Sequence, residues 1–337
     1  MYMKLRCHIL SGIVIMCPLL LHAIDGASAY NFLNTPSSSR VYGLGGVNIS
    51  LVDDDISVTE QNPALLGPEV EKQLALNYMR YIGGSNFAGV RYGMAATERS
   101  AWSAAIQYFG YGDFKASDPS GNITGDFSAH DMYFAGTYSH DITDRLRGGI
   151  SIKGIYSSYE EYSAFAVAAD LGLNYFDGDN DLSLSMVVAN LGGQIKRFND
   201  TYDRLPIDVR LGVSKGFENL RFSVTAWNLT KWKLPYYETG DGTVSESPTV
   251  KESFSSNLFR HLVFSAEFIP SDRFYIGIGY NYKTRTDMST YSRNFLSGFS
   301  ACAGINVKQF GVGIALAQPH TGATTFMLNL TTRLYEF

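Results

Sequence analysis

The chain has 337 residues, of which 45% are hydrophobic and 14% aromatic, with a mean hydropathy of -0.06 and a formal charge of -5. This hydropathy excludes a protein built of several membrane-crossing helices, each of which needs about 20 consecutive apolar residues. The mild acidity and the lack of a basic patch argue against nucleic acid as a partner.

Residues 1–29 have the pattern of a secretory signal peptide. Lys4 and Arg6 precede an apolar stretch from residue 9 to residue 21, and the small residues Ala27 and Ala29 offer a cleavage site. A lipoprotein signal is the alternative, but it requires a small residue before the lipidated cysteine and this chain has Met at position 16. Cleavage would leave Cys302 as the single cysteine, so no internal disulfide is expected.

Residues 30–72 differ from the rest of the chain and predict a short N-terminal plug or hatch. The segment carries a glycine motif, an acidic run and an Asn-Pro pair, made of Gly43, Gly45, Gly46, Asp53, Asp54, Asp55, Asn62 and Pro63. The three aspartates could bind Ca²⁺ through their oxygens. A turn that caps a short helix over residues 56–61 is the favoured interpretation.

Residues 73–337 alternate apolar and polar side chains, which is the pattern of strands with one oily and one wet face. The pattern predicts an all-β fold, a closed antiparallel transmembrane β-barrel of about 14 strands. The strands are expected to start near Leu74, Asn86, Ser100, His130, Arg145, Ser163, Asp181, Leu205, Asn219, His261, Asp272, Ser297, Lys308 and Thr324.

The connections between these strands fall into two classes of length. Links after even-numbered strands are short, whereas most odd-numbered strands are followed by longer loops, over residues 111–129, 192–204, 230–260 and 284–296. Short turns on one side and long loops on the other are typical of outer-membrane barrels. We therefore expect a bacterial outer-membrane location, with long loops extracellular and both termini periplasmic.

The alternation also predicts which side chains contact lipid. In the strand from residue 146 to residue 156, Ile150 and Ile152 should face lipid, whereas Ser151 and Lys153 should face the lumen. The physical reason is that a basic side chain at the bilayer midplane costs roughly 2–4 kcal/mol.

The sequence carries no signature of catalysis or of a bound metal. There is no Gly-x-Ser-x-Gly elbow, no lysine follows a serine at the third position, and the glycine motif lacks the lysine of a P-loop. The histidines are not spaced for zinc. We therefore expect a protein that is not an enzyme and needs no cofactor, and a soluble secreted β-enzyme is the disfavoured alternative.

Several motifs resemble those of a known family. The glycine motif, the acidic turn and Asn62-Pro63-Ala64-Leu65-Leu66, followed by a barrel, are similar to the FadL-type fourteen-stranded outer-membrane proteins. Within that group, the segments 189–193 (Ala-Asn-Leu-Gly-Gly) and 205–212 (Leu-Pro-Ile-Asp-Val-Arg-Leu-Gly) resemble the PorV and PorQ proteins of the type IX secretion system of Bacteroidetes, and the short chain favours the PorQ kind.

This resemblance implies a non-enzymatic platform in a cell-surface attachment complex. The partners would be a PorZ-like surface protein, a PorU-like sortase and a PorV-like shuttle, in a membrane that contains lipopolysaccharide. The long loops would bind them, with Tyr236, Tyr237, Phe254 and Phe259 as candidate anchors. The alternative function is a FadL-like transporter, which the resemblance implies would pass hydrophobic small molecules through a lateral opening beside the hatch.

Overall fold

The computed structural model describes residues 29–117, 120, 122–199, 202–234, 236–238, 249–251, 253–287, 296–320 and 323–334. All of the predicted signal peptide except Ala29 lies outside these residues.

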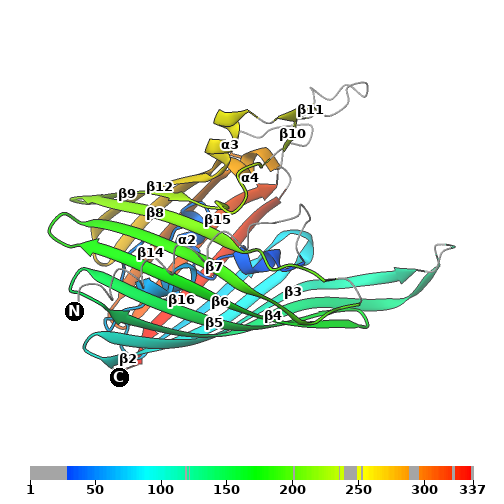
Figure 1. Ribbon diagram of the computed structural model, residues 1–337, viewed down its shortest axis with the longest axis horizontal. Helices are drawn as coiled ribbons and strands as arrows, with labels where there is room; N and C mark the ends of the chain where they lie inside the picture. Colours follow the sequence, from blue (N-terminus) through cyan, green and yellow to red (C-terminus); the bar gives the residue numbers. More distant parts are fainter. Residues whose placement is uncertain are drawn as a thin grey trace, which may run out of the picture.

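Fourteen antiparallel strands close into one barrel, as the sequence predicts (Figure 1). The first strand pairs with both the second and the last, so the sheet has no free edge along its closing seam. Closure is what a lipid environment demands, because backbone groups there must be paired within the protein. The barrel strands are β1 (Gln73–Arg80), β2 (Asn86–Thr97), β3 (Ser100–Ser117), β4 (Ile123–Asp141), β5 (Leu146–Tyr159), β6 (Tyr162–Asp177), β7 (Leu182–Lys196), β8 (Asp208–Phe217), β9 (Leu220–Ala226), β12 (Leu262–Ser271), β13 (Phe274–Asn281), β14 (Phe299–Val307), β15 (Phe310–His320) and β16 (Ala323–Arg333).

The expected loop over residues 111–129 is wrong, because β3 and β4 continue through most of it as a long hairpin. Their pairing extends to Ser117 opposite Ile123. Phe114 stacks on Phe127 at 5.4 Å, and Lys115 forms an ion pair with Asp126 at 2.6 Å. These cross-strand pairs stabilise strands beyond the barrel wall, where no lipid requires an apolar face. The fourth strand consequently starts at Ile123 rather than near His130.

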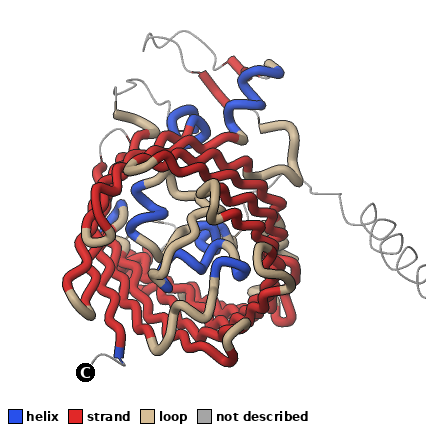
Figure 2. The backbone as a smooth tube through the Cα atoms, turned by 90° about the vertical axis from the view of Figure 1, so that its left-hand side faces the viewer, coloured by secondary structure: helices blue, strands red, loops and turns tan. Residues whose placement is uncertain are grey.

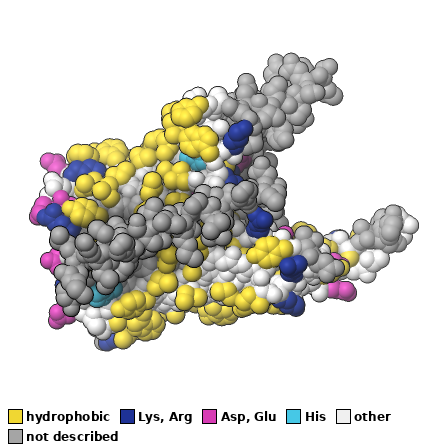
Figure 3. Space-filling model, viewed as in Figure 1, with side chains coloured by type: hydrophobic (Ala, Val, Ile, Leu, Met, Phe, Trp, Pro, Cys, Tyr) yellow, Lys and Arg dark blue, Asp and Glu magenta, His cyan; other side chains and the backbone are white. Residues whose placement is uncertain are grey.

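The two faces of the wall are sorted as predicted. Ile152 is 57% exposed on the outside, whereas its neighbours Ser151 and Lys153 are buried in the lumen. The same alternation holds in β14, where Ser300 and Cys302 point inward and Phe299 outward. Figure 3 shows hydrophobic side chains over much of the wall, with charged side chains gathered at the end that carries the short turns. The outer face is therefore an apolar belt suited to hydrocarbon.

Short elements at the end with the long loops occupy part of the other expected loops. A separate hairpin pairs β10 (Tyr236–Glu238) with β11 (Thr249–Lys251), and it is followed by α3 (Phe254–Arg260). The helix α4 (Tyr282–Asp287) follows β13, and the 3-10 turn η5 (Ile82–Gly84) joins β1 to β2. No helix among the described residues is long and apolar enough to cross a membrane.

The lumen is filled by the chain that precedes β1. This plug segment, residues 29–72, lies inside the ring of strands when the barrel is viewed from its short-turn end (Figure 2). It contains the 3-10 helices η2 (Asn31–Asn34), η3 (Ile56–Gln61) and η4 (Pro63–Leu65) and the short helix α2 (Ser39–Gly43).

Candidate functional site in the barrel lumen

The glycine motif of the plug lies against the wall formed by β13 and β14. A Cβ atom at Gly43 would stand 2.2 Å from the Cβ of Cys302, so the backbone of α2 approaches the wall as closely as atoms allow. Gly45 and Gly46 follow with φ of +99° and +83°, a left-handed conformation that glycine adopts at little cost. The Gly45 amide donates to the Ser300 hydroxyl at 3.0 Å. The motif therefore docks the plug by close backbone contact.

Asp53 belongs to a buried charge network that joins the plug to β12. Arg40 donates to Asp53 at 2.5 Å and, through Nε, to Glu267 at 2.6 Å. Burial raises the pKa of Asp53, but the guanidinium groups of Arg40 and Arg221 outweigh burial and hold that pKa below its usual range. The Arg40 guanidinium also lies 4.2 Å from the centre of the Tyr275 ring. These contacts fix the middle of the plug to the wall.

The other two aspartates point to different partners. Asp54 forms an ion pair with Arg333 at the end of β16. Asp55 caps η3 by accepting from the Ser57 amide at 2.8 Å, and it also accepts from the Thr331 hydroxyl at 3.1 Å. The capping role agrees with the favoured sequence interpretation. Because the carboxylates diverge, they do not form a calcium cage.

The Asn-Pro pair fits into a recess made by two wall glycines. Asn62 caps η4 by accepting from the Ala64 amide at 2.9 Å. A Cβ atom at Gly149 of β5 would stand 2.4 Å from the carbonyl carbon and oxygen of Pro63, and one at Gly172 of β6 would stand 2.2 Å from Oδ1 of Asn62. The wall residues here are glycine because the plug occupies the space of their side chains.

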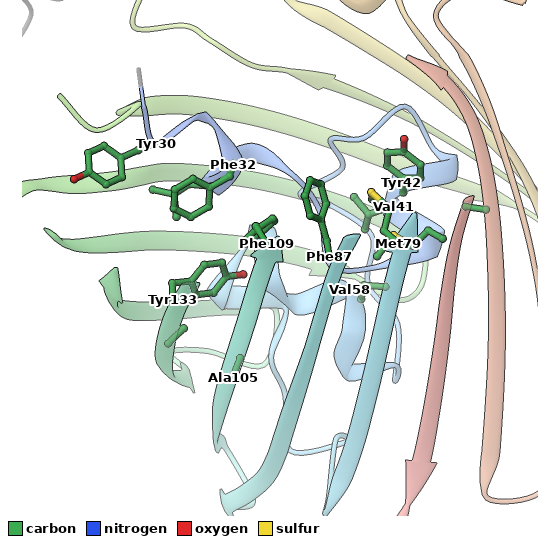
Figure 4. Close-up of a cluster of buried hydrophobic side chains, with 14 of the residues drawn as sticks. Tyr30, Phe32, Val41, Tyr42, Val58, Met79, Phe87, Ala105, Phe109 and Tyr133 are labelled. Atoms are coloured by element: carbon green, nitrogen blue, oxygen red, sulfur yellow. The ribbon is translucent and has the colours of Figure 1, made fainter. Parts of the chain in front are cut away.

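Toward the long-loop end, the lumen holds a cluster of aromatic side chains rather than polar ones (Figure 4). Phe32 of the plug lies 5.0 Å from Phe109 of β3, ring centre to ring centre, and Phe109 lies 4.8 Å from Phe87 of β2. The plug residue Tyr30 adjoins Phe32 at 6.2 Å, and Tyr133 of β4 adjoins Phe109 at the same distance. We call Tyr30, Phe32, Phe87, Phe109 and Tyr133 the aromatic cluster.

Polar groups cover the aromatic cluster where it meets the barrel rim. The carboxylate of Asp131 is fully buried and accepts hydrogen bonds from the hydroxyls of Tyr111, at 2.5 Å, and Tyr159, at 2.8 Å. On the plug side, Tyr133 donates to Glu60. The cluster thus combines an apolar interior with a few hydrogen-bonding groups at its boundary, the composition typical of small-molecule sites.

The wall changes character where β7 passes the aromatic cluster. The ladder between β7 and β8 ends at the pair Ala189–Asp208, so residues 190–196 of β7 have no partner on β8. Gln194 on this edge donates through Nε2 to the hydroxyl of Tyr30 at 2.8 Å. An edge of the sheet without a neighbouring strand therefore lies next to the plug end of the cluster.

The predicted partner anchors lie away from the lumen, at the long-loop end. Phe254 and Phe259 both belong to α3 and are 70% and 49% exposed. Phe254 lies 5.6 Å from the ring of Trp232, and the Tyr236–Tyr237 backbone forms β10. The structure thus brings the two phenylalanines together on one helix, separate from the plug motifs.

Sequence reasoning missed the aromatic cluster. A signal exists where aromatic residues follow one another at the strand ends, as in Tyr108-Phe109 and Tyr133-Phe134. Two adjacent aromatic residues occupy both faces of a strand, so one of them must enter the lumen.

The comparisons with known proteins give a fold but no family. No family model matches the sequence, and no curated protein matches it. Among solved structures, the toluene transporter TbuX of Ralstonia pickettii matches with a TM-score of 0.55 at 12% identity, over 90% of this chain and 100% of that one.

Two further structures agree with it. A TodX deltaS2S3 mutant, a monoaromatic hydrocarbon channel, has a TM-score of 0.52 at 12% identity over 88% of this chain and 97% of that one. A Pseudomonas aeruginosa FadL homologue has a TM-score of 0.50 at 13% identity over 89% of this chain and 98% of that one. The fold is therefore that of the FadL-type outer-membrane barrels.

Proposed function

We propose that the chain is an outer-membrane transporter that passes small hydrophobic molecules, aromatic ones included, through a plugged barrel. The observation that carries the proposal is the aromatic cluster, because the lumen of a barrel that conducts only water and ions has no use for it. The printed descriptions of TbuX and TodX, a toluene transporter and a monoaromatic hydrocarbon channel, support the same class of solute.

The plug accounts for selectivity in this proposal. Phe32 of the plug occupies the middle of the cluster, between Phe109 and Tyr30. A solute with an aromatic ring would replace these ring contacts with its own, so displacement of η2 costs little apolar contact when the solute is present. Ions and sugars would gain nothing from the site.

The proposed route leaves the cluster beside the unpaired edge of β7, which is where the lateral opening implied by the FadL resemblance would lie. Gly193 is on this edge, and a Cβ atom there would stand 2.4 Å from the Tyr202 hydroxyl. The variant Gly193→Trp is expected to slow solute uptake while the barrel still folds and inserts. Uptake at the unchanged rate in a correctly inserted Gly193→Trp barrel would contradict this route.

The transport proposal is tested by locking the plug. Ser50 of the plug and Ser214 of β8 have their hydroxyl oxygens 2.7 Å apart, so the double variant Ser50→Cys/Ser214→Cys, made with Cys302→Ser, can form a disulfide. Uptake of radiolabelled toluene by a Gram-negative host should rise when the barrel is expressed. Uptake should fall to the background of the empty host when the disulfide is oxidised, and recover on reduction. Equal uptake with and without the barrel would refute the proposal.

A second candidate function is the type IX attachment-complex scaffold that the sequence resemblance implies. The observation that favours it is the exposed pair Phe254 and Phe259 on α3, since large aromatic side chains are frequent anchors at protein interfaces. The solved structures described above support the transporter instead. Affinity purification from membranes should lose a PorZ-like partner in the double variant Phe254→Ser/Phe259→Ser, and an unchanged set of partners would count against the scaffold.

A further inference from the structure

A small cavity is enclosed between the plug and the wall formed by β1, β2, β3 and β16. Its polar lining comes from Ser37, Ser57, Asn77, Arg91, Gln107 and Asn329. The cavity has room for about one water molecule. It lies on the opposite side of the plug from the Arg40 network described above, and the proposed transport does not use it.

Arg91 of β2 differs from the other buried cations of the lumen. Arg40, Lys153 and Arg210 each have a carboxylate partner within 2.7 Å. The Arg91 side chain is 6% exposed, yet no carboxylate of the described residues lies within ion-pair distance of it. Its Nη1 atom reaches the Ser103 hydroxyl at 3.5 Å, and its Nε atom has no hydrogen-bond partner.

The neutral groups around Arg91 cannot supply the missing charge. The amide of Asn77 donates to the Gln107 carbonyl oxygen at 3.2 Å, so these two side chains satisfy one another. The carboxylate of Glu60 on the plug is taken by the amide and hydroxyl of Ser37 and by the Tyr133 hydroxyl. A buried guanidinium normally has an anionic partner, because its charge is otherwise left without compensation.

We propose that Arg91 and this cavity form a binding site for one small monovalent anion, with the chemistry of a halide or a carboxylate. A guanidinium presents N–H donors in a fixed fork that suits both anions. The size of the cavity excludes larger oxyanions while the plug is in place.

The anion has two possible sources. One is a free halide from the medium. The other is the carboxylate end of a hydrophobic solute, because Arg91 lies two inward-facing positions from Phe87 on the same strand and so borders the aromatic cluster. Only this second source rests on the proposed transport function.

Crystals of the whole barrel grown with sodium bromide test the site directly. An anomalous bromide peak next to the Arg91 guanidinium is expected in the wild type and not in Arg91→Gln. A peak that persists in Arg91→Gln would mark an adventitious ion, and the absence of a peak in the wild type would equally overturn the proposal.

Stability in solution separates an anion site from a structural arginine. Bromide should raise the Tm of the wild type saturably by a few degrees relative to isethionate at equal ionic strength, and should leave the Tm of Arg91→Gln unchanged. The charge-matched control Arg99→Gln, on an exposed turn, should respond as the wild type does. A purely structural role predicts instead that Arg91→Gln is destabilised equally in both salts, which would refute the proposal.

Titration with benzoate distinguishes the sources. If benzoate raises the Tm and removes the bromide peak, the site takes carboxylates; if only bromide acts, the site takes halides. Either result supports the anion site. Both are independent of toluene uptake, so failure of the transport proposal would be seen separately.

Discussion

The aromatic cluster makes a quantitative prediction about Phe32. This side chain is 6% exposed and lies between the rings of Tyr30 and Phe109. Truncation of a buried phenylalanine to alanine costs about 3–5 kcal/mol, of which the cavity accounts for about 24 cal/mol per Å³. A cavity of roughly 100 Å³ would thus contribute about 2.4 kcal/mol in Phe32→Ala.

The cavity left by Phe32→Ala would have an apolar lining and about the size of a benzene ring. Such cavities stay dry and bind benzene. A ligand present at about 100 times its dissociation constant stabilises the folded state by roughly 2.7 kcal/mol, so saturating toluene should restore more than half of the loss. The wild type, with Phe32 in place, should respond less.

Urea titration of the barrel in lipid vesicles, with and without toluene, measures both quantities. The control is Phe222→Ala, which removes a ring from the lipid-facing side of β9 and opens no cavity in the lumen. The reasoning is refuted if toluene stabilises Phe32→Ala no more than it stabilises Phe222→Ala, or if Phe32→Ala loses less than about 1 kcal/mol.

Two further predictions concern the wall. Ile152→Arg, near the middle of the lipid-facing belt, should cost about 2–4 kcal/mol by the same titration, whereas Leu146→Arg at the strand end should cost about 0–1 kcal/mol; equal costs would contradict a bilayer around the barrel. Gly149→Val places atoms where Pro63 lies and should loosen the plug, seen as faster proteolysis of the plug segment, whereas Gly136→Val has open space around its Cβ and should not; equal proteolysis of both variants would argue against plug docking at this recess.

The barrel was predictable because lipid imposes a strict rule on each strand. Every outward position between the interfaces must be apolar, so the alternation around Ile152 can be read without knowing any tertiary contact. The strand starts consequently agree closely with expectation, except in the hairpin of β3 and β4. There the strands leave the membrane, and a polar sequence such as that around Asp126 looks like a loop although it pairs as a sheet.

The lumen was less predictable, because no solvent rule governs an inward position once a plug fills it. Gly149 and Gly172 are ordinary strand glycines in the sequence, and only the placement of Pro63 explains them. Phe87 and Phe109 likewise carry no mark that their partner is Phe32, more than fifty residues earlier in the chain. Contacts of this kind depend on the path of the plug, which no local pattern specifies.

The difference between the two ends of the plug bears on how the barrel would open. Near the turns, the plug is held by close backbone contacts and by charge pairs such as Arg40 with Glu267, whose disruption would leave a buried charge without a partner. Around Phe32 it is held by ring contacts alone, which a hydrophobic solute can replace with contacts of the same kind. A solute that enters from the long-loop end would therefore displace η2 while the charge network stays closed. Opening would then be local, and the barrel would stay sealed to ions while it passes an apolar molecule.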